Sequence, residues 1–586
     1  MVTQPSNPFR RPPTRRPRYL LSPRFRLVTV WAFMVLVMVG LSARLVRLQL
    51  IMGERLQVQA QEQRQIPQRP RASRRPIIDR QGNVLAVDRV VYTIYAHPML
   101  FSRSREEMAT TLGELLNLAQ DGLLQRFQEQ ETGIQVAVDV SEELTERLRS
   151  LRLDGLDLLP NQQRFYPQQA LMSQLVGYIN LEGDSQAGLE YALEERLLYE
   201  QEDVPYGGNL QRQSLTIERQ PLNRDALKLQ LTVDSRLQRI AQRNLEATVQ
   251  RHGAKQGALI VMDSRDGAIV SLAVTPTYDP NRYYEADVEQ FRNWAVSDLY
   301  EPGSTFKPIN VAIALEEGLI KPDEYIFDEG KLHYDEWVIQ NVDYTAVGGR
   351  GSINITDILR HSSNVGMVHI MERLKRSDYY AWLEKMGLGS STGIELPAES
   401  LAQLKTRPQF VNSAVEAATT AFGQGFSINP IQLAQLHSAL ANGGTLVTPH
   451  VVRGLVDQEG GLMWQPQRPA TKQLFSKETT QAVVGMMEAV VKSGSGQSAQ
   501  VANYRLGGKT GTAQKANDYG GYGDGRVVSF VGILPVENPR YVVLAVIDEP
   551  LGENAYGSTV AAPLVKSVVE SLVVMAGIPP SSAGDE

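Results

Sequence analysis

The segment from Leu27 to Ala43 carries no charged residue, and it restricts the possible folds of this chain more than any other feature of the sequence. The apolar character continues beyond Arg44 and Arg47 to Leu48, and the two arginines can extend their charged ends toward lipid headgroups. The apolar stretch then reaches about 20 residues, the length of a helix that crosses the hydrocarbon core of a bilayer. We therefore expect a transmembrane anchor over residues 27–48.

Residues 1–26 indicate how this anchor is oriented. They contain seven arginines, no acidic residue and several prolines, a composition typical of a disordered segment. Basic flanks stay on the cytoplasmic side, and we find no other segment of spanning length. The expectation is a single-pass protein of the inner (plasma) membrane with a cytoplasmic N-terminus and a periplasmic or extracytoplasmic remainder.

Two other interpretations of the apolar segment fit less well. A cleaved signal peptide would have an unusually long leading region and a poor cleavage site near Gly40 and Ser42. A buried core helix would not normally lie beside so many arginines.

The composition of the chain excludes several classes of function. Among the 586 residues, 42% are hydrophobic and 21% are charged, as in folded domains, and the net charge of −6 argues against a nucleic-acid partner. No cysteine is present, so disulfides and thiolate metal sites are excluded. Length and changes in composition predict five segments: a cytoplasmic basic tail (1–26), the anchor (27–48), a non-catalytic pedestal domain (49–225), a larger domain (226–577) and a flexible tail (578–586).

The segment between the anchor and residue 225 has the pattern of a mixed α+β domain. Its expected elements are a polar stalk, a hairpin, a strand and two helical stretches: Gln57–Gln68, Ile77–Ala86, Val90–Ala96, Arg105–Phe127 and Ser141–Leu151. No cluster of titratable residues suggests catalysis, so we interpret the segment as a spacer or docking domain. Arg164 and Glu190 are interpreted as ion-pair partners that hold its subdomains in register.

The larger domain begins and ends with strands and is mainly helical between them. Its terminal elements are expected at Leu229–Val233, Asp234–Val249, Gly257–Met262, Ala268–Val274, Val527–Leu534, Tyr541–Ile547 and Ala561–Ala576. This order predicts one antiparallel sheet assembled from the two ends of the domain, with helices packed on it, and hence an α+β fold.

The helical middle of this domain opens on the only S-x-x-K of the sequence, Ser304 to Lys307. A Pro302-Gly303 turn precedes Ser304 and the apolar run Ile309–Leu315 follows it, so we expect a buried helix that begins at Ser304. Pro308 is tolerated in the first turn, and Ser304 and Lys307 lie on one helix face. A lysine activates a serine only as the neutral amine, and lowering its pKa from about 10.4 toward about 7 requires burial and a second cation nearby.

Two further motifs supply the partners that such a pair needs. Ser362-Ser363-Asn364 is one of three S-x-N sequences, and it alone lies in a bend between two apolar helical runs. Lys509-Thr510-Gly511-Thr512 is the only K-T-G, and its glycine lets a ligand approach the backbone closely. Lys509 is therefore the expected second cation beside Lys307 and a partner for a substrate carboxylate.

These three motifs occur in the order of the penicillin-binding signature. The sequence resembles the class B penicillin-binding proteins, and its S-S-N-V-G and K-T-G-T-A stretches look like those of the division-specific FtsI branch. The resemblance covers nearly all of the chain and includes the anchor and the stretches Asp79-Arg80-x-Gly82, Arg164-x-x-Pro167, Gly188-Leu189-Glu190, Leu231-Thr232-Val233-Asp234, Asp279-Pro280-Asn281 and Glu301-Pro302-Gly303. It departs at Arg74-Arg75, where the family usually has Arg-Gly.

The resemblance implies a fold and a reaction. The fold is a single transmembrane helix, an elongated pedestal (dimerisation-like) domain over 49–225 and a penicillin-binding/serine β-lactamase-like transpeptidase domain over 226–577. The reaction is the cross-linking of peptidoglycan stem peptides by a serine-type D-Ala-D-Ala transpeptidase in septal wall synthesis, through an acyl-enzyme that penicillin also forms. No metal or cofactor takes part.

The resemblance also implies roles for the motif residues. The catalytic residues are Ser304, Lys307, Ser362, Asn364 and Lys509, and the substrate-binding residues are Thr510, Gly511 and Thr512. Ser304 is the nucleophile, Lys307 is its base, and Ser362 relays a proton to the leaving D-alanine. Backbone N–H groups of Ser304 and Thr512 form the oxyanion hole.

A transpeptidase without a polymerase domain needs glycan strands made elsewhere. The resemblance therefore implies a SEDS-type, FtsW-like glycan polymerase and other divisome membrane proteins as partners. Three alternatives stay open: an elongation-type class B transpeptidase, a β-lactam-hydrolysing or β-lactam-sensing protein, and a non-catalytic divisome scaffold. His361 beside Ser362 is expected to cap a helix end on backbone carbonyls without a catalytic role, and no histidine has a metal spacing such as H-E-x-x-H.

Overall fold

The computed structural model describes residues 23–47, 73–199, 225–334, 337–516 and 521–581. The chain divides into two units, Met1–Pro70 and Arg71–Glu586, which are described separately. The predicted stalk, most of the predicted basic tail and the last residues of the predicted C-terminal tail lie outside the described residues.

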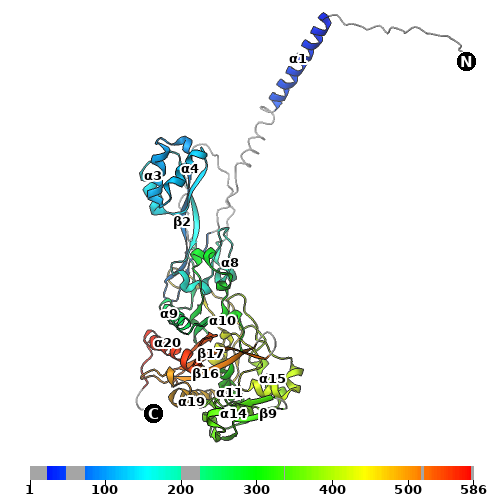
Figure 1. The fold of residues 1–586 in the computed structure, drawn as a ribbon, viewed down its shortest axis with the longest axis vertical. Coiled ribbons are helices and arrows are strands. Elements are labelled where there is room, and N and C mark those ends of the chain that lie inside the picture. The colour runs from blue at the N-terminus through cyan, green and yellow to red at the C-terminus, as the bar shows by residue number, and fades with distance from the viewer. Residues whose placement is uncertain (1–22, 48–72, 200–224, 335–336, 517–520, 582–586) are drawn as a thin grey trace, which may run out of the picture. The chain divides into compact units, whose positions relative to one another are not determined.

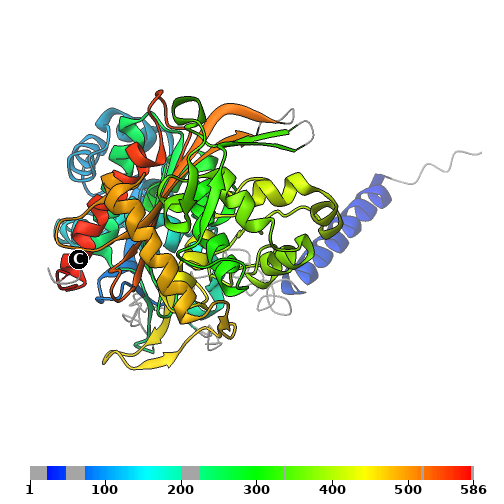
Figure 2. The same cartoon turned by 90° about the horizontal axis from the view of Figure 1, so that it is seen from below.

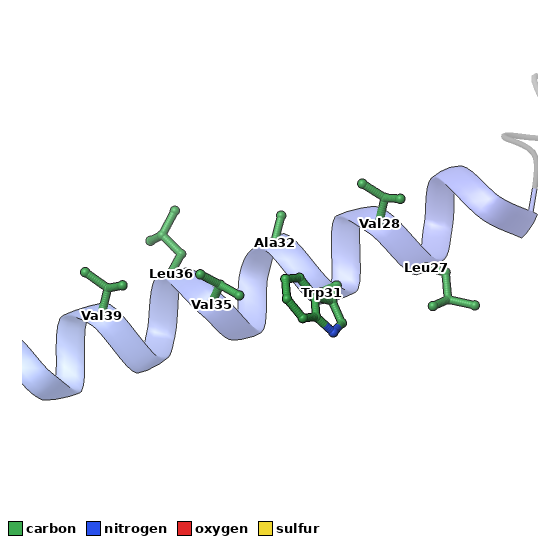
Figure 3. Close-up of a pocket in the computed structure, with 7 residues that line it drawn as sticks. All are labelled: Leu27, Val28, Trp31, Ala32, Val35, Leu36 and Val39. Carbon is green, nitrogen blue, oxygen red and sulfur yellow. The ribbon is translucent and has the colours of Figure 1, made fainter.

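The described part of the first unit is one long apolar helix, α1 (Pro23–Val46). Its large side chains are open to the surroundings, and Trp31 and Phe33 are each 69% exposed. Figure 3 shows apolar side chains along this helix: Leu27, Val28, Trp31, Ala32, Val35, Leu36 and Val39. In water such exposure is unfavourable by roughly 25 cal/mol for each Å² of apolar surface, so the helix is suited to anchor the chain in a membrane.

One other described helix is long and apolar enough to cross a bilayer, which differs from the expectation of one such segment. This stretch, Gly557–Met575, contains α20 (Ala562–Met575), and half of it is buried inside the protein. Val565, Val568 and Leu572 belong to the hydrophobic core on one face of the main sheet. Its apolar face is therefore covered by protein, as in a core helix of a globular domain.

Residues 73–199 form a mixed domain around one long strand, β2 (Val84–Ala96), which is labelled in Figure 1. The other elements are β1 (Ile77–Ile78), β3 (Ile134–Ser141), β4 (Leu156–Phe165), α3 (Arg105–Leu116), α4 (Gln120–Glu129), α5 (Glu142–Ser150), α6 (Ser173–Val176), α7 (Gly188–Ala192) and α8 (Glu194–Leu197). The predicted β1–β2 hairpin is confirmed. The helical stretch predicted over 105–127 is two helices, because Asn117 adopts a left-handed conformation (φ 54°) and ends α3.

The sheet of this domain continues past residue 225. β5 (Lys228–Leu231) pairs in parallel with β1, and β13 (Val452–Val456) and β14 (Leu462–Trp464) extend the same sheet. Asp79, in the β1–β2 turn, accepts hydrogen bonds from the backbone N–H (3.2 Å) and the hydroxyl (2.6 Å) of Ser235 at the start of α9 (Ser235–Arg251). The two predicted domains thus share a sheet, and the boundary between 225 and 226 stays a prediction.

A buried ionic cluster holds the strands of the pedestal together. Arg164 on β4 bonds to Asp88 on β2 (3.0 Å) and to Glu190 on α7 (2.7 Å). Arg74 bonds to the second carboxylate oxygen of Glu190 (3.0 Å), and the Glu190 side chain is fully buried. The interpretation of Arg164 and Glu190 as structural ion-pair partners is confirmed.

We expect Glu190→Gln to destabilise the pedestal by about 3–5 kcal/mol, because it leaves two buried guanidinium groups without their shared carboxylate. The free energy of unfolding from denaturant titrations of the purified protein tests this. The control is Glu143→Gln, whose ion pair with Arg147 is exposed on both sides and should contribute less than about 1 kcal/mol. Equal effects of the two substitutions would contradict a central role for Glu190.

The larger domain is built on a five-stranded antiparallel sheet in the order β16-β17-β18-β6-β7. Its strands are β6 (Gln256–Asp263), β7 (Ile269–Thr275), β16 (Gly507–Ala516), β17 (Tyr522–Leu534) and β18 (Tyr541–Asp548). Strands from both ends of the domain meet where β6 pairs with β18, as predicted. Side chains of β6 alternate between two cores: Leu259 and Val261 share one with α9 (Ser235–Arg251) and α20, and Ile260 lies in the other. This confirms the α+β fold.

The remaining helices are α10 (Trp294–Ser297), α11 (Lys307–Glu316), α12 (Tyr344–Val347), α13 (Ile355–Arg360), α14 (Asn364–Met371), α15 (Arg376–Lys385), α16 (Arg407–Asn412), α17 (Ala414–Thr420), α18 (Pro430–Ala441) and α19 (Lys477–Ser493). The remaining strands are β8 (Tyr325–Asp328), β9 (Lys331–Tyr334), β10 (Trp337–Gln340), β11 (Gly351–Asn354), β12 (Thr445–Leu446) and β15 (Lys472–Gln473). Figure 2 shows the yellow-green helices of this middle region, which include α15, lying together to one side of the larger domain.

Two helices bring α11 and the edge strand β16 together. Every residue of α18 is buried, and this helix packs against β6, β18 and α11. α19 packs along β16 and also contacts α11, as can be followed in Figure 1. The S-x-x-K and K-T-G motifs, far apart in the sequence, are therefore neighbours across this edge of the sheet.

Candidate active site

Ser304 lies in a short 3₁₀ turn, Gly303–Phe306, that continues into α11 at Lys307. The sequence predicted an α-helix from Ser304 onward. Pro308 explains the difference, because it has no N–H for the α-helical bond to the Ser304 carbonyl, which accepts from the Lys307 N–H instead. Gly303 enters the turn with a positive φ of 55°.

Two buried groups hold this turn from behind. Gly423 accepts a hydrogen bond from the N–H of Gly303 (2.9 Å), and a Cβ atom on Gly423 would lie 2.0 Å from the Gly303 carbonyl oxygen. The buried ring of His437 on α18 lies with Nε2 2.8 Å from the carbonyl of Thr305. A carbonyl only accepts, so Nε2 carries the proton, and burial lowers the pKa of His437 to about 4, which keeps the ring neutral.

Lys307 is fully buried and has three hydrogen-bond partners. Its Nζ lies 2.6 Å from the carbonyl oxygen of Ser362, 2.7 Å from Oδ1 of Asn364 and 3.1 Å from Oγ of Ser362. Burial is the main cause that lowers the pKa of Lys307 well below its usual value, and the charge of Lys509 adds to it. In the neutral form that a base requires, the amine has two N–H bonds; donated to the two acceptor-only oxygens, they leave its lone pair facing the Ser362 hydroxyl.

The hydroxyl of Ser362 is the centre of the site. Its Oγ lies 2.9 Å from Oγ of Ser304, 2.9 Å from Nζ of Lys509 and 3.1 Å from Nζ of Lys307. The hydrogen-bonded path from Ser304 to Lys307 thus runs through Ser362. Ser362 has a φ of 58°, a left-handed conformation that a residue with a side chain adopts only when its surroundings enforce it.

The K-T-G motif lies on β16 beside the Ser304 turn. Lys509 is fully buried, and this burial lowers its pKa to about 7. The Thr510 hydroxyl contacts the hydroxyl of Ser495 (2.8 Å), and the Thr512 hydroxyl accepts from the N–H of Gly557 (3.2 Å). A Cβ atom on Gly511 would lie 2.9 Å from Cγ2 of Thr305, so glycine permits the close contact between β16 and the turn.

The structure brings together all five residues predicted to be catalytic, and it places Thr510, Gly511 and Thr512 on the adjacent strand. Their individual roles stay predictions. His361 caps the end of α13, as expected, but its ring contacts the side chain of Arg360 (3.3 Å) rather than a backbone carbonyl. Sequence reasoning missed four groups that support the site, Asp328, Gln340, Asn341 and His437, none of which belongs to a recognised motif.

Comparisons with protein families match both domains. The model of the penicillin-binding protein transpeptidase domain matches residues 257–570, and the model of the penicillin-binding protein dimerisation domain matches residues 69–206. The first match covers the three motifs, and the second covers most of the predicted pedestal.

Comparisons with curated relatives match nearly the whole chain. The FtsI homolog of Mesostigma viride, a peptidoglycan D,D-transpeptidase, is 38% identical over 95% of this chain and 96% of its own length. Stage V sporulation protein D of Bacillus subtilis is 31% identical over 95% of this chain and 86% of its own length. The probable peptidoglycan D,D-transpeptidase PenA of Neisseria gonorrhoeae is 30% identical over 87% of this chain and 86% of its own length.

Solved structures with the same fold include penicillin-binding protein 3 of Mycobacterium tuberculosis in complex with aztreonam. It superposes with a TM-score of 0.66 at 25% identity, over 88% of this chain and 98% of that protein. The complex of the same protein with ampicillin also has a TM-score of 0.66, at 26% identity and the same coverage.

Proposed function

This chain belongs to the penicillin-binding protein family of transpeptidases as a class B, FtsI-like member, and on this basis we propose how it cross-links peptidoglycan stem peptides in septal wall synthesis. It is a serine-type D,D-transpeptidase. Its substrate is peptidoglycan, and its inhibitors are β-lactams. The observation that carries the proposal is the contact of one hydroxyl, that of Ser362, with the Ser304 hydroxyl and with both buried lysines.

We propose that acylation starts with a proton relay. The Ser304 proton moves to the Ser362 oxygen as the Ser362 proton moves to the neutral amine of Lys307. The Ser304 oxygen attacks the carbonyl carbon between the two terminal D-alanines, and the C–N bond breaks. The leaving D-alanine takes up the proton from Lys307 through Ser362, so the acyl-enzyme forms with both groups restored.

The second step transfers the acyl group to an amine of a neighbouring stem peptide. The amine attacks the ester carbonyl, gives up a proton to Lys307 through Ser362, and the ester C–O bond breaks. That proton returns to the Ser304 oxygen, which regenerates the free enzyme.

The Ser304 turn and β16 carry the groups that we assign to the two negative charges of the substrate, the oxyanion and the terminal carboxylate. We assign the backbone N–H groups of Ser304 and Thr512 as hydrogen-bond donors to the oxyanion. In other acyl-transfer enzymes each such donor stabilises the transition state by roughly 3 kcal/mol. The protonated form of Lys509 and the hydroxyls of Thr510 and Thr512 are assigned to the terminal carboxylate. The contact of β16 with the turn, for which Gly511 leaves room, supports this arrangement.

The function is tested with the purified, detergent-solubilised full chain and a stem pentapeptide. Release of D-alanine together with an acceptor-dependent dimer, both blocked by penicillin, is the expected result. Release of D-alanine with hydrolysed peptide alone would refute a transpeptidase. Rapid turnover of penicillin would favour the β-lactam-hydrolysing alternative.

The alkaline side of the pH profile should report on Lys509. Its pKa of about 7 means that its positive charge is present below that pH and lost above it. The second-order rate constant for acylation by penicillin, which carries a carboxylate, should therefore fall as the pH rises through this value. Lys509→Arg keeps the positive charge at all these pH values, so the rate constant of the variant should be lower than that of the wild type but should no longer fall as the pH rises. An unchanged fall of the rate constant in this variant would exclude Lys509 as the titrating group.

The cellular context of the reaction is also part of the proposal. We place the N-terminus in the cytoplasm and the domains after α1 outside it, supported by the seven arginines of residues 1–26. A SEDS-type, FtsW-like polymerase and other divisome proteins are the proposed membrane partners. Fusion of reporters before residue 27 and after residue 577 tests the orientation, and enrichment of the protein at the division site distinguishes septal from elongation synthesis.

A further inference from the structure

Two buried side chains outside the three motifs are bonded to each other beside the Ser362 bend. Asp328 ends β8 and is fully buried, and Asn341 follows β10 and is 2% exposed. The Nδ2 atom of Asn341 lies 2.9 Å from each carboxylate oxygen of Asp328. Since an amide N–H can only donate to these oxygens, the amide oxygen of Asn341 must point the other way, toward the bend.

The amide oxygen of Asn341 holds the start of α14. It accepts the backbone N–H of Asn364 (2.8 Å) and of Val365 (3.2 Å), and it lies 3.3 Å from the hydroxyl of Ser363. The first N–H groups of a helix have no partner within the helix, so Asn341 supplies from another segment an acceptor that the helix lacks. This contact anchors the residues directly after Ser362, whose left-handed backbone needs enforcement.

The neighbouring residue orients the side chain of Asn364. The Nδ2 atom of Asn364 donates to the carbonyl of Gln340 (2.9 Å), which turns its Oδ1 toward Nζ of Lys307 (2.7 Å). The Gln340-Asn341 segment therefore sets the backbone position and the amide orientation of Asn364. Both oxygens that take the N–H bonds of Lys307 depend on this bend.

We propose that Asp328 and Asn341 form a positioning pair for the general base, which acts through the Ser362–Asn364 bend to aim the lone pair of Lys307 at the Ser362 hydroxyl. This inference rests on the proposed function. Among the described residues, the side chains of the pair make no hydrogen bond to Ser304 or to β16; the pair sets the geometry of the two oxygens that the amine faces. The charged groups that act on Lys307 are Lys509, Asp328 and Asp343.

The pair can be tested by exchanging its members. Asn341→Asp removes the amide donor and places two carboxyl groups against each other. Asp328→Asn combined with Asn341→Asp restores the hydrogen bonds between the two positions with donor and acceptor exchanged. The new amide at 328 donates to one oxygen of the new carboxylate at 341, and the other oxygen accepts the N–H groups of the bend. Both variants are made in the full chain and acylated with fluorescent penicillin.

The single variant is expected to lower the first-order acylation rate constant about 100-fold with little change in the dissociation constant of the initial complex, as for loss of an oriented general base. The double variant should recover to within about tenfold of wild type, and the acidic limb of its pH profile should shift because the negative charge has moved relative to Lys307. Asn310→Asp is the control, since Asn310 is a buried asparagine of α11 that bonds to Thr420, Ala421 and Tyr379. Asp328→Asn should not rescue it.

The outcomes separate a positioning pair from a merely stabilising one. A folded Asn341→Asp protein with the wild-type acylation rate overturns the proposal. So does a double variant whose melting temperature recovers while its acylation rate does not. If the single variant does not fold, the rate and pH profile of the double variant decide. A wild-type protein that penicillin does not acylate refutes the proposed function itself.

Discussion

Replacement of Ser304 by alanine will abolish covalent labelling by fluorescent penicillin and will leave the fold intact. The Ser304 oxygen is the atom that must bond to the acyl carbon, and its hydroxyl contacts Ser362, through which its proton leaves in the proposed relay. Loss of the nucleophile in a serine protease lowers kcat by about 10⁶-fold, and we expect an effect of this order here. Denaturing gel fluorescence and a melting curve measure both quantities.

The matched control is Ser352→Ala, at the exposed serine of another S-x-N sequence, on β11. It should label as the wild type does, and label on the wild type should decay slowly in a chase. Persistent label on the Ser304→Ala protein would move the nucleophile elsewhere. A cell that divides with Ser304→Ala as its sole copy would favour the non-catalytic scaffold.

The parts of the site that sequence reasoning reached are those with a local pattern. Residues three apart on a helix lie about one turn apart, so the spacing of Ser304 and Lys307 places them on one helix face. The Pro302-Gly303 turn and the apolar run after it indicate that the segment is a helix. The need for a second cation, argued from the pKa of a base, led to Lys509, whose charge does act on Lys307. Apolar strands at the two ends of the domain, with a helical middle between them, were sufficient to predict the main sheet.

The parts that could not be predicted depend on pairings between distant segments. Asp328 and Asn341 sit at the ends of two short strands, and neither residue type nor spacing connects them to Ser362. The addition of β13 and β14 to the pedestal sheet brings residues near 455 beside β5, and no local pattern encodes that pairing. The burial of α20 has the same origin, because hydropathy alone does not reveal what covers an apolar face.

Lys307→Met is the second large effect that we expect. Methionine fills a similar volume and removes only the amine, so acylation should slow by about 10³–10⁴-fold, at the upper end of what a general base contributes. The acidic limb of the wild-type profile, where Lys307 gains its proton, should disappear in the variant. Stopped-flow acylation over a range of pH measures both.

The same variant changes how stability depends on pH, which gives an independent check on the state of Lys307. Its folded pKa lies below its unfolded value, so between the two the unfolded chain binds more protons and wild-type stability rises with pH. Lys307→Met removes this contribution, so the wild type should gain stability relative to the variant as the pH rises from the lowered pKa toward about 10.4. Lys331→Met, at a partly exposed lysine on β9, should change neither profile. If the acidic limb survives in Lys307→Met, the base is another group, and Lys509, 2.9 Å from the same hydroxyl, takes that role.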